Sequence, residues 1–129
     1  MSEARTPAEI VRAFCGVWER GEFERFGEFL AADAMLHMLP LAPVHGSEAI
    51  REECRKLARL GTLSVRILNL AADGDLVLTE RIDGLEQPDR AGELPVAGIF
   101  EVRDGKIVAW RDYFDLCQAL AAFGLEAPI

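Results

Sequence analysis

The spacing of apolar residues changes once along this chain, near residue 60, and that change limits the possible folds more than any other feature. Before it, apolar residues recur every three or four positions, as at Ile10, Phe14 and Trp18, which is typical of amphipathic helices. After it, they alternate with polar residues, as at Leu63 and Val65, which is typical of half-buried strands. Helices followed by a run of strands predict an α+β fold in which helices cover one side of a mainly antiparallel sheet.

Turn and capping residues divide the chain into elements. Thr6, Pro7 and Glu9 form the pattern of a capping box with a first-turn proline, so a helix is expected to begin there and to end at Gly21. The other expected elements are a short helix over 23–30, a strand over 35–39, a helix capped by Ser47, strands from 63, over 76–83, 93–102 and 107–114, and a last helix from Asp115 to Gly124. The polar segment 84–92 is expected to be an exposed hairpin loop.

Composition narrows the class of protein. A chain of 129 residues that is 50% hydrophobic is long enough for one folded domain, expected over 1–129. Its net charge of −8 disfavours nucleic acids and anionic membrane surfaces as partners, because both would repel it. We find no membrane-spanning stretch or signal peptide and three widely spaced cysteines, Cys15, Cys54 and Cys117. We therefore expect a cytoplasmic protein with reduced thiols packed as small hydrophobic groups.

Strand alternation brings charged residues into an apolar setting. Arg81 and Asp83 share one face of the strand 76–83, and Asp112 shares a face with Trp110 and Phe114 in the strand 107–114. An ionised group among such neighbours is costly unless it is paired. If the three charged residues converge, one guanidinium would favour charge on one aspartate while repulsion and burial keep a proton on the other, which is an acid–base device. The alternatives are a buried structural ion network, or strand-end residues that reach solvent.

Two segments carry a family resemblance. Residues 78–83 (LTERID) and 105–116 (GKIVAWRDYFDL) resemble those of the limonene-1,2-epoxide hydrolase family, within the NTF2-like and SnoaL-like superfamily, and residues 39–46 (LPLAPVHG) resemble its proline-rich loop. The order of helices and strands agrees with that family as well. The resemblance implies a cone-shaped α+β fold, with a curved mixed or antiparallel sheet, N-terminal helices on its concave side, and a homodimer.

The same resemblance implies a reaction. In this family an arginine and two aspartates add water to an epoxide in one step, without a covalent intermediate. By position, Asp112 matches the general base that activates the water, Asp83 the acid that protonates the epoxide oxygen, and Arg81 the arginine that bridges them. Trp110 and Phe114 would then form part of an apolar wall around a small lipophilic substrate.

The first strand departs from the family pattern. A tyrosine and an asparagine that help to hold the water in the family are matched here by Leu36 and Met38. These two residues would then line the substrate pocket, but they cannot hydrogen-bond a water usefully. His37 points to the other face by alternation, although a one-residue slip would bring it in, and His45 lies in a loop that can reach a pocket mouth. We expect both histidines to be structural or exposed. With no metal-ligand spacing and no glycine-rich phosphate loop, no metal or cofactor is expected.

Three functions remain open at this point. The first is hydrolysis of a small lipophilic epoxide by the Asp–Arg–Asp set. The second is proton transfer next to a carbonyl, as in SnoaL-like cyclases and ketosteroid isomerase-like enzymes, which needs no positioned water. The third is a binding module that keeps an apolar cavity without turnover.

Overall fold

The structure is a computed structural model that describes residues 5–125. Its helices are α1 (Pro7–Glu19), a turn of 3-10 helix η1 (Phe23–Arg25), α2 (Phe26–Phe29), α3 (Ser47–Ala58) and α4 (Leu116–Phe123). Its strands are β1 (Leu30–Leu39), β2 (Val44–His45), β3 (Thr62–Asp73), β4 (Leu76–Gln87), β5 (Arg90–Arg103) and β6 (Lys106–Tyr113). The predicted α+β class, with helices first and a run of strands after residue 60, is confirmed.

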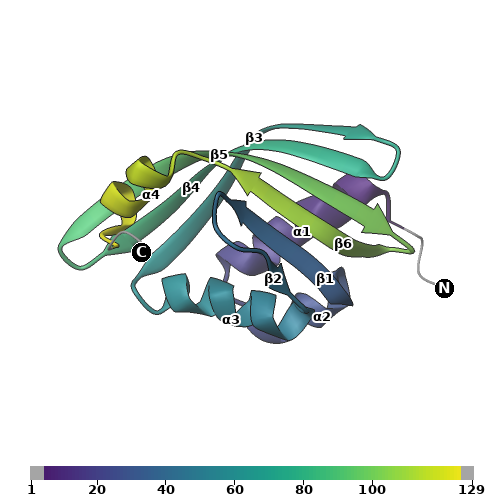
Figure 1. Cartoon of the computed structure of the whole chain (residues 1–129), viewed down its shortest axis with the longest axis horizontal. Coiled ribbons are helices and arrows are strands. Elements are labelled where there is room, and N and C mark those ends of the chain that lie inside the picture. Colours follow the sequence, from purple (N-terminus) through teal and green to yellow (C-terminus); the bar gives the residue numbers. More distant parts are fainter. Residues whose placement is uncertain (1–4, 126–129) are drawn as a thin grey trace.

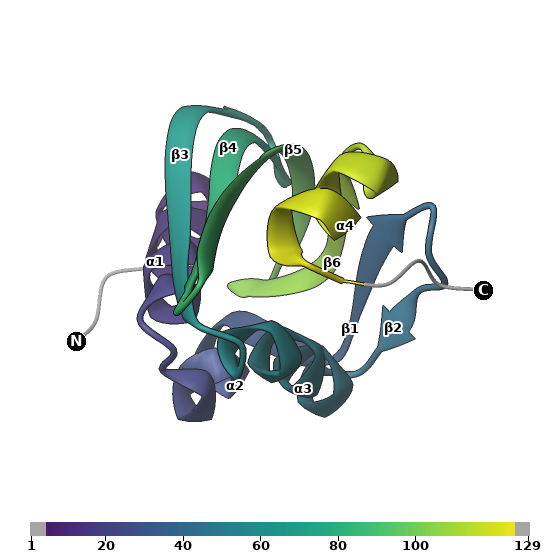
Figure 2. The ribbon, with the colours of Figure 1, turned by 90° about the vertical axis from the view of Figure 1, so that its left-hand side faces the viewer.

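The strands form one curved sheet in the order β2-β1-β6-β5-β4-β3 (Figure 1). The sheet is mixed, because β1 runs parallel to β6 while every other neighbouring pair is antiparallel. It curls around a central space that α3 borders on one side and α4 on another (Figure 2). Helix α1 packs mainly on β3, so the N-terminal helices cover the concave side, as expected.

Local signals at the helix ends account for their positions. The Thr6 hydroxyl accepts a hydrogen bond from the Glu9 N–H at 3.2 Å, and the Glu9 carboxylate accepts one from the Thr6 N–H at 2.9 Å, which completes the capping box. Gly21 follows α1 with a φ of 70°, a left-handed conformation that costs glycine little. Asp115 caps α4 through the Gln118 N–H, and the helix ends at Gly124, as predicted.

The prediction of an exposed loop over 84–92 is wrong. Strand β4 continues to Gln87 and β5 begins at Arg90, so the polar residues of this segment form the end of a long hairpin. Leu85 points inward and is buried, while Glu86 and the turn residues Pro88 and Asp89 are exposed to solvent, so most polar residues of the segment are accommodated. Gly92 lies against the backbone carbonyl of Ala122 in α4, an approach that a Cβ would prevent.

Two smaller predictions are also corrected. Ser47 does not cap α3: Gly46 occupies the cap position, with a φ of 96°, and Ser47 is the first helical residue. Leu30 belongs to β1 and not to the helix before it, because β1 starts there beside Ile107 of β6. The first strand is therefore five residues longer at its start than the expected 35–39.

Aromatic packing joins the helices to the sheet at the centre of the molecule. Phe14 of α1 is fully buried, with its ring centroid 5.0 Å from that of Phe26 and 5.3 Å from that of Trp110. Trp18 lies one turn further along α1, 5.0 Å from Trp110. Rings of this size dominate core energetics, so α1 fixes Trp110 and the strand that carries it.

The cysteines are all free thiols, but only two are packed as expected. Cys15 and Cys54 are buried, whereas Cys117 is exposed on α4. No helix within residues 5–125 is long and apolar enough to cross a membrane.

Candidate active site

The three charged residues singled out from the strand alternation meet on the concave side of the sheet. Arg81 and Asp83 come from β4, and Asp112 comes from β6, with β5 between the two strands. Gly98 of β5 is the register partner of both Thr79 and Asp112. A Cβ at this position would lie 2.7 Å from Asp112 Oδ1 and against the guanidinium. The missing side chain therefore opens the path by which the arginine crosses β5.

The arginine bridges the two carboxylates with paired hydrogen bonds. Toward Asp83, Arg81 Nε donates to Oδ1 at 3.1 Å and Nη2 donates to Oδ2 at 2.9 Å. Toward Asp112, Nη1 donates to Oδ1 at 3.1 Å and Nη2 donates to Oδ2 at 3.0 Å. Such two-point pairs fix orientation as well as charge.

Every N–H of the guanidinium is used. The remaining Nη1 donor goes to the Thr79 hydroxyl at 3.2 Å, and that hydroxyl donates in turn to the Gly98 carbonyl at 3.1 Å. Arg81 is 0% exposed, and its Cζ lies 5.4 Å from the centroid of the Trp18 ring. Since arginine has five N–H donors, the group is fully satisfied and held rigidly from all sides.

Trp110 adds a contact that the strand alternation did not reveal. Its indole Nε1–H donates to Asp112 Oδ1 at 2.8 Å, and the ring is 1% exposed. The sequence placed Trp110 and Asp112 on one face, but two residues sharing a face need not bond. Thr79, two residues before Arg81 on the same strand face, likewise forms a bond that alternation alone does not indicate.

The cluster contains one guanidinium and two carboxyl groups, so the positive charge of Arg81 can balance only one carboxylate. Burial lowers the pKa of Arg81, but Asp112 and Asp83 outweigh that effect and hold it well above its ordinary value, so the guanidinium stays charged. Burial raises the pKa of Asp83, and the opposing attraction of Arg81 does not cancel the increase. Asp112 accepts three hydrogen bonds, against two for Asp83. Asp112 is thus the more heavily hydrogen-bonded carboxyl group, while burial shifts Asp83 toward its neutral form.

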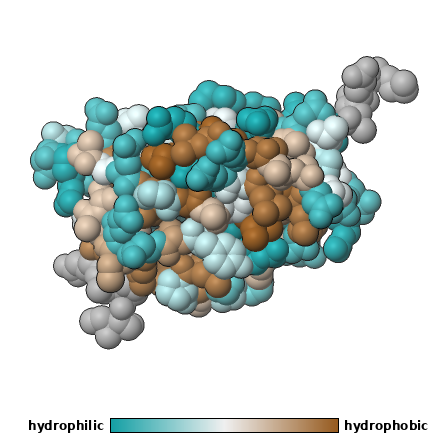
Figure 3. All heavy atoms as spheres, turned by 90° about the horizontal axis from the view of Figure 1, so that it is seen from above, coloured by the Kyte–Doolittle hydropathy of each residue, from teal (hydrophilic) through white to brown (hydrophobic). Residues whose placement is uncertain are grey.

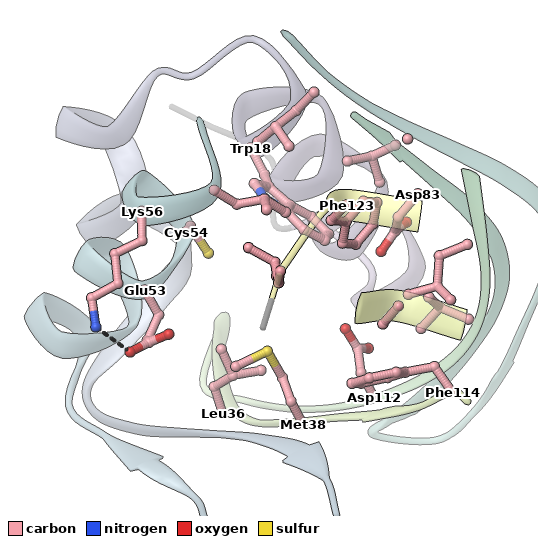
Figure 4. Close-up of a pocket in the computed structure, with 18 of the residues that line it drawn as sticks. Trp18, Leu36, Met38, Glu53, Cys54, Lys56, Asp83, Asp112, Phe114 and Phe123 are labelled. Atoms are coloured by element: carbon pink, nitrogen blue, oxygen red, sulfur yellow. Dashed lines mark hydrogen bonds and ion pairs between the residues drawn. The ribbon is translucent and has the colours of Figure 1, made fainter. Parts of the chain in front are cut away.

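Both aspartates face a cavity of about 460 Å³ (Figure 4). Leu36 and Met38 of β1 line it beside Trp110 and Asp112, which are their register partners in β6. Further lining residues come from α1, α3, α4 and the segment after β6, and include Trp18, Cys54, Leu57, Phe114, Ala119, Leu120 and Phe123. The four pocket residues named from the sequence, Leu36, Met38, Trp110 and Phe114, all line this cavity. The helical contributions could not be read from spacing, because they depend on how α3 and α4 fold over the sheet.

The two histidines lie away from the cavity lining. His37 sits on β1 opposite Arg111, on the other face from Leu36 and Met38, and His45 is exposed on β2. Cys54 does line the cavity, and burial raises its pKa, so its thiol stays protonated and is a poor nucleophile.

The sequence of residues 5–124 matches the limonene-1,2-epoxide hydrolase catalytic domain. The chain belongs to the limonene-1,2-epoxide hydrolase family. It is 32% identical over 106 residues to the epoxide hydrolase EphG of Mycobacterium tuberculosis, a match that covers 82% of this chain and 71% of that protein. Membership agrees with the expected type of enzyme, a hydrolase of this family.

Solved structures support the fold assignment. A limonene-epoxide-hydrolase-like epoxide hydrolase of M. tuberculosis superposes with a TM-score of 0.81 at 29% identity, covering 91% of this chain and 88% of the other. A protein from Catenulispora acidiphila with a ketosteroid isomerase-like fold, in complex with trimethylamine, also gives 0.81, at 25% identity, covering 95% of this chain and 100% of the other. The NTF2-like fold is thus shown.

The paired arginine predicts a pH-dependent stability defect. Replacing Arg81 by Met leaves two buried carboxyl groups without their cation, so the free energy of unfolding should fall by about 3–5 kcal/mol at neutral pH. The deficit should shrink as the pH is lowered and the carboxyls take up protons. Urea unfolding at several pH values measures this, with Arg66→Met as control, since Arg66 is exposed. A deficit that does not change with pH would contradict the pairing.

Proposed function

We propose that this protein opens small lipophilic epoxides in one step, with Asp112 as general base, Asp83 as general acid and Arg81 as the cation that sets their charges. The observation that supports this most strongly is the two-point pairing of one buried guanidinium with both carboxyl groups at the wall of an apolar cavity. A structural ion network has no need of a cavity at its carboxyl groups. Membership of the limonene-1,2-epoxide hydrolase family gives independent support.

The roles proposed for the two aspartates suit a reaction in which one proton is given and another is taken up at the same time. Asp83 is the group that gives a proton to the epoxide oxygen as the C–O bond breaks, a role that its pKa, raised by burial, favours. Asp112 carries the negative charge and takes a proton from the nucleophile at the same time. Neither a free hydroxide nor a free alkoxide has to form.

Hydrogen bonding identifies the basic atom on Asp112. Its Oδ1 accepts from both Arg81 and Trp110, which uses both lone pairs of that oxygen. Its Oδ2 accepts only from Arg81 Nη2 and keeps one lone pair. Oδ2 is therefore the atom of Asp112 that receives the proton.

The cavity favours a lipophilic substrate. Its lining is mostly leucine, methionine, alanine and aromatic side chains, and its volume of about 460 Å³ suits a small molecule. The low polarity strengthens the charge interactions among Arg81, Asp83 and Asp112. Proton transfer next to a carbonyl needs one base, whereas the structure pairs two carboxyl groups with one cation, so epoxide opening is the better fit.

Diol formation from a panel of terpene and aryl epoxides tests this function. The unaltered protein should turn over at least one lipophilic epoxide, and Asp112→Asn or Asp83→Asn should each lower the rate by about 100-fold or more, because each removes one proton transfer. Asp115→Asn is the matched control, since Asp115 caps α4 and is exposed. Turnover that survives Asp112→Asn would rule out the assigned base.

We also propose a homodimer that forms through the outer face of the sheet. Figure 3 shows apolar side chains gathered on the face seen from above in Figure 1. Leu78 of β4 is 45% exposed, on the strand face opposite to that of Thr79 and Arg81, and Ile99 is its register partner in β5. Exposed apolar patches on a sheet commonly mark contacts with another chain.

Sedimentation velocity tests the dimer. The unaltered protein should sediment as a dimer, and Leu78→Glu should shift it toward the monomer by placing a charge in the contact. Leu60→Glu serves as control, because Leu60 is also exposed, at 38%, but follows α3. A monomer for the unaltered protein, or a dimer unaffected by Leu78→Glu, would contradict this face as the contact.

A further inference from the structure

We infer that Trp18 determines substrate specificity, because its indole N–H binds a neutral oxygen atom of the substrate other than the epoxide oxygen. The preferred substrates are then lipophilic epoxides that carry a second oxygen, in a carbonyl or ether group. The inference rests on the proposed function, because it names the substrate class of the same cavity. It follows from the hydrogen-bond donors around the cavity and from which of them already have a partner.

The donors next to the two aspartates are already paired. All five N–H groups of Arg81 go to Asp83, Asp112 and Thr79. The indole N–H of Trp110 goes to Asp112 Oδ1, and the Thr79 hydroxyl goes to a backbone carbonyl of β5. A substrate oxygen can therefore take none of these donors without breaking a hydrogen bond of the protein.

The indole N–H of Trp18 is free to bind a ligand. Of the two tryptophans in the chain, only Trp110 donates its indole N–H to a group within residues 5–125. Trp18 is 7% exposed and lines the cavity. Its nitrogen is not fully enclosed, since the fully enclosed side-chain N and O atoms without a partner in the same range are Arg51 Nε and Gln87 Oε1. The N–H is therefore reached from the cavity that Trp18 lines.

The packing of Trp18 fixes this donor but does not explain it. Its ring centroid lies 5.4 Å from Arg81 Cζ and 5.0 Å from the centroid of the Trp110 ring. A phenyl ring could make the same two contacts without bringing a polar atom into the interior. A buried donor is unfavourable unless it finds an acceptor, and buried polar groups are paired in most proteins. A bound ligand with an oxygen at this point supplies the missing acceptor.

The donor serves a part of the substrate that lies away from the epoxide. The guanidinium of Arg81 lies over the face of the Trp18 ring, whereas the N–H leaves the ring in its plane, so it is not aimed at Arg81. In Figure 4, Trp18 and Cys54 reach the cavity from the helices, and Met38 and Asp112 reach it from the sheet. The epoxide has to contact the aspartates in the proposed reaction. A second oxygen, on the part of the substrate that faces α1 and α3, is then the atom that meets the indole N–H.

The charges around the cavity favour a neutral acceptor. The aspartates carry one more potential negative charge than Arg81 can balance, and Glu53 also lines the cavity, so a carboxylate ligand would be repelled. Lys56 offers an anion little compensation, because it pairs with Glu53 at 2.9 Å and its side chain is 62% exposed. A carbonyl or ether oxygen accepts a hydrogen bond from the indole without bringing a charge into an apolar space.

A matched pair of inert ligands tests the inference without any reaction. Acetylcyclohexane and isopropenylcyclohexane differ by the exchange of a carbonyl oxygen for a CH2 group, and neither contains an epoxide. Protein labelled with nitrogen-15 has two indole N–H signals, which Trp18→Phe assigns. We expect the ketone to move the Trp18 proton signal downfield and the alkene to leave it nearly unchanged. The ketone should also bind about three- to tenfold more tightly, because it alone pairs with the N–H.

Variants separate the N–H from the shape of the side chain. Trp18→Phe should make the two affinities equal, because it removes the donor. Replacement of Trp18 by 3-benzothienylalanine, which has the shape of tryptophan without the N–H, should do the same and covers the case in which the phenylalanine variant does not fold. Phe123→Leu is the control, because Phe123 also lines the cavity but carries no donor, so the preference for the ketone should remain.

The same exchange of groups on a cyclohexene oxide extends the test to turnover. The acetyl-substituted epoxide should be opened with a kcat/KM about three- to tenfold above that of the isopropenyl-substituted one, and Trp18→Phe should remove the difference. Equal binding of the two inert ligands, or a Trp18 signal that does not distinguish them, overturns the inference while the opening of both epoxides leaves the proposed function standing. If the ketone binds at Trp18 but neither epoxide is opened in a way that depends on Asp112, the proposed function fails and the oxygen-binding role of Trp18 stands.

Discussion

A fully buried arginine that uses all five of its N–H groups is the constraint around which the rest of this site is arranged. Arg81 has 0% exposure, so each donor needs a partner inside the protein. Asp83, Asp112 and Thr79 supply the partners. Gly98 supplies the opening in β5 through which the guanidinium reaches β6. A side chain at that position would separate Asp112 from its cation, so the charge cluster depends on a residue that takes no part in its hydrogen bonds.

Much of this was predictable from strand periodicity. Alternation put Arg81 and Asp83 on one face and Asp112 on the apolar face of its strand, and the family resemblance added their roles. The bond from Trp110 to Asp112 was not predictable, because sharing a face does not fix which atoms meet. Segment 84–92 was wrongly expected to be a loop, because it is mostly polar and contains only one inward-facing leucine, Leu85. Helices α3 and α4 close the cavity by tertiary packing, which sequence spacing does not encode.

The low polarity of the cavity has opposite effects on acid–base chemistry and on the binding of water. The low polarity that favours a proton on Asp83 also removes the contacts that would hold a nucleophilic water near Asp112. Leu36 and Met38 lie at this point, as partners of Trp110 and Asp112 across β1 and β6. The apolar side chains at this point can pack against a carbon chain.

The central claim is that Arg81 neutralises one carboxylate, so that Asp112 is charged and Asp83 holds the proton. Infrared difference spectroscopy of the carboxyl stretch reads this directly when the unaltered protein is compared with Asp83→Asn and Asp112→Asn near the pH of highest activity. A band of a protonated, buried carboxyl group should be present in the unaltered protein, absent in Asp83→Asn and retained in Asp112→Asn. A band that disappears with Asp112→Asn and persists with Asp83→Asn would reverse the assignment of acid and base.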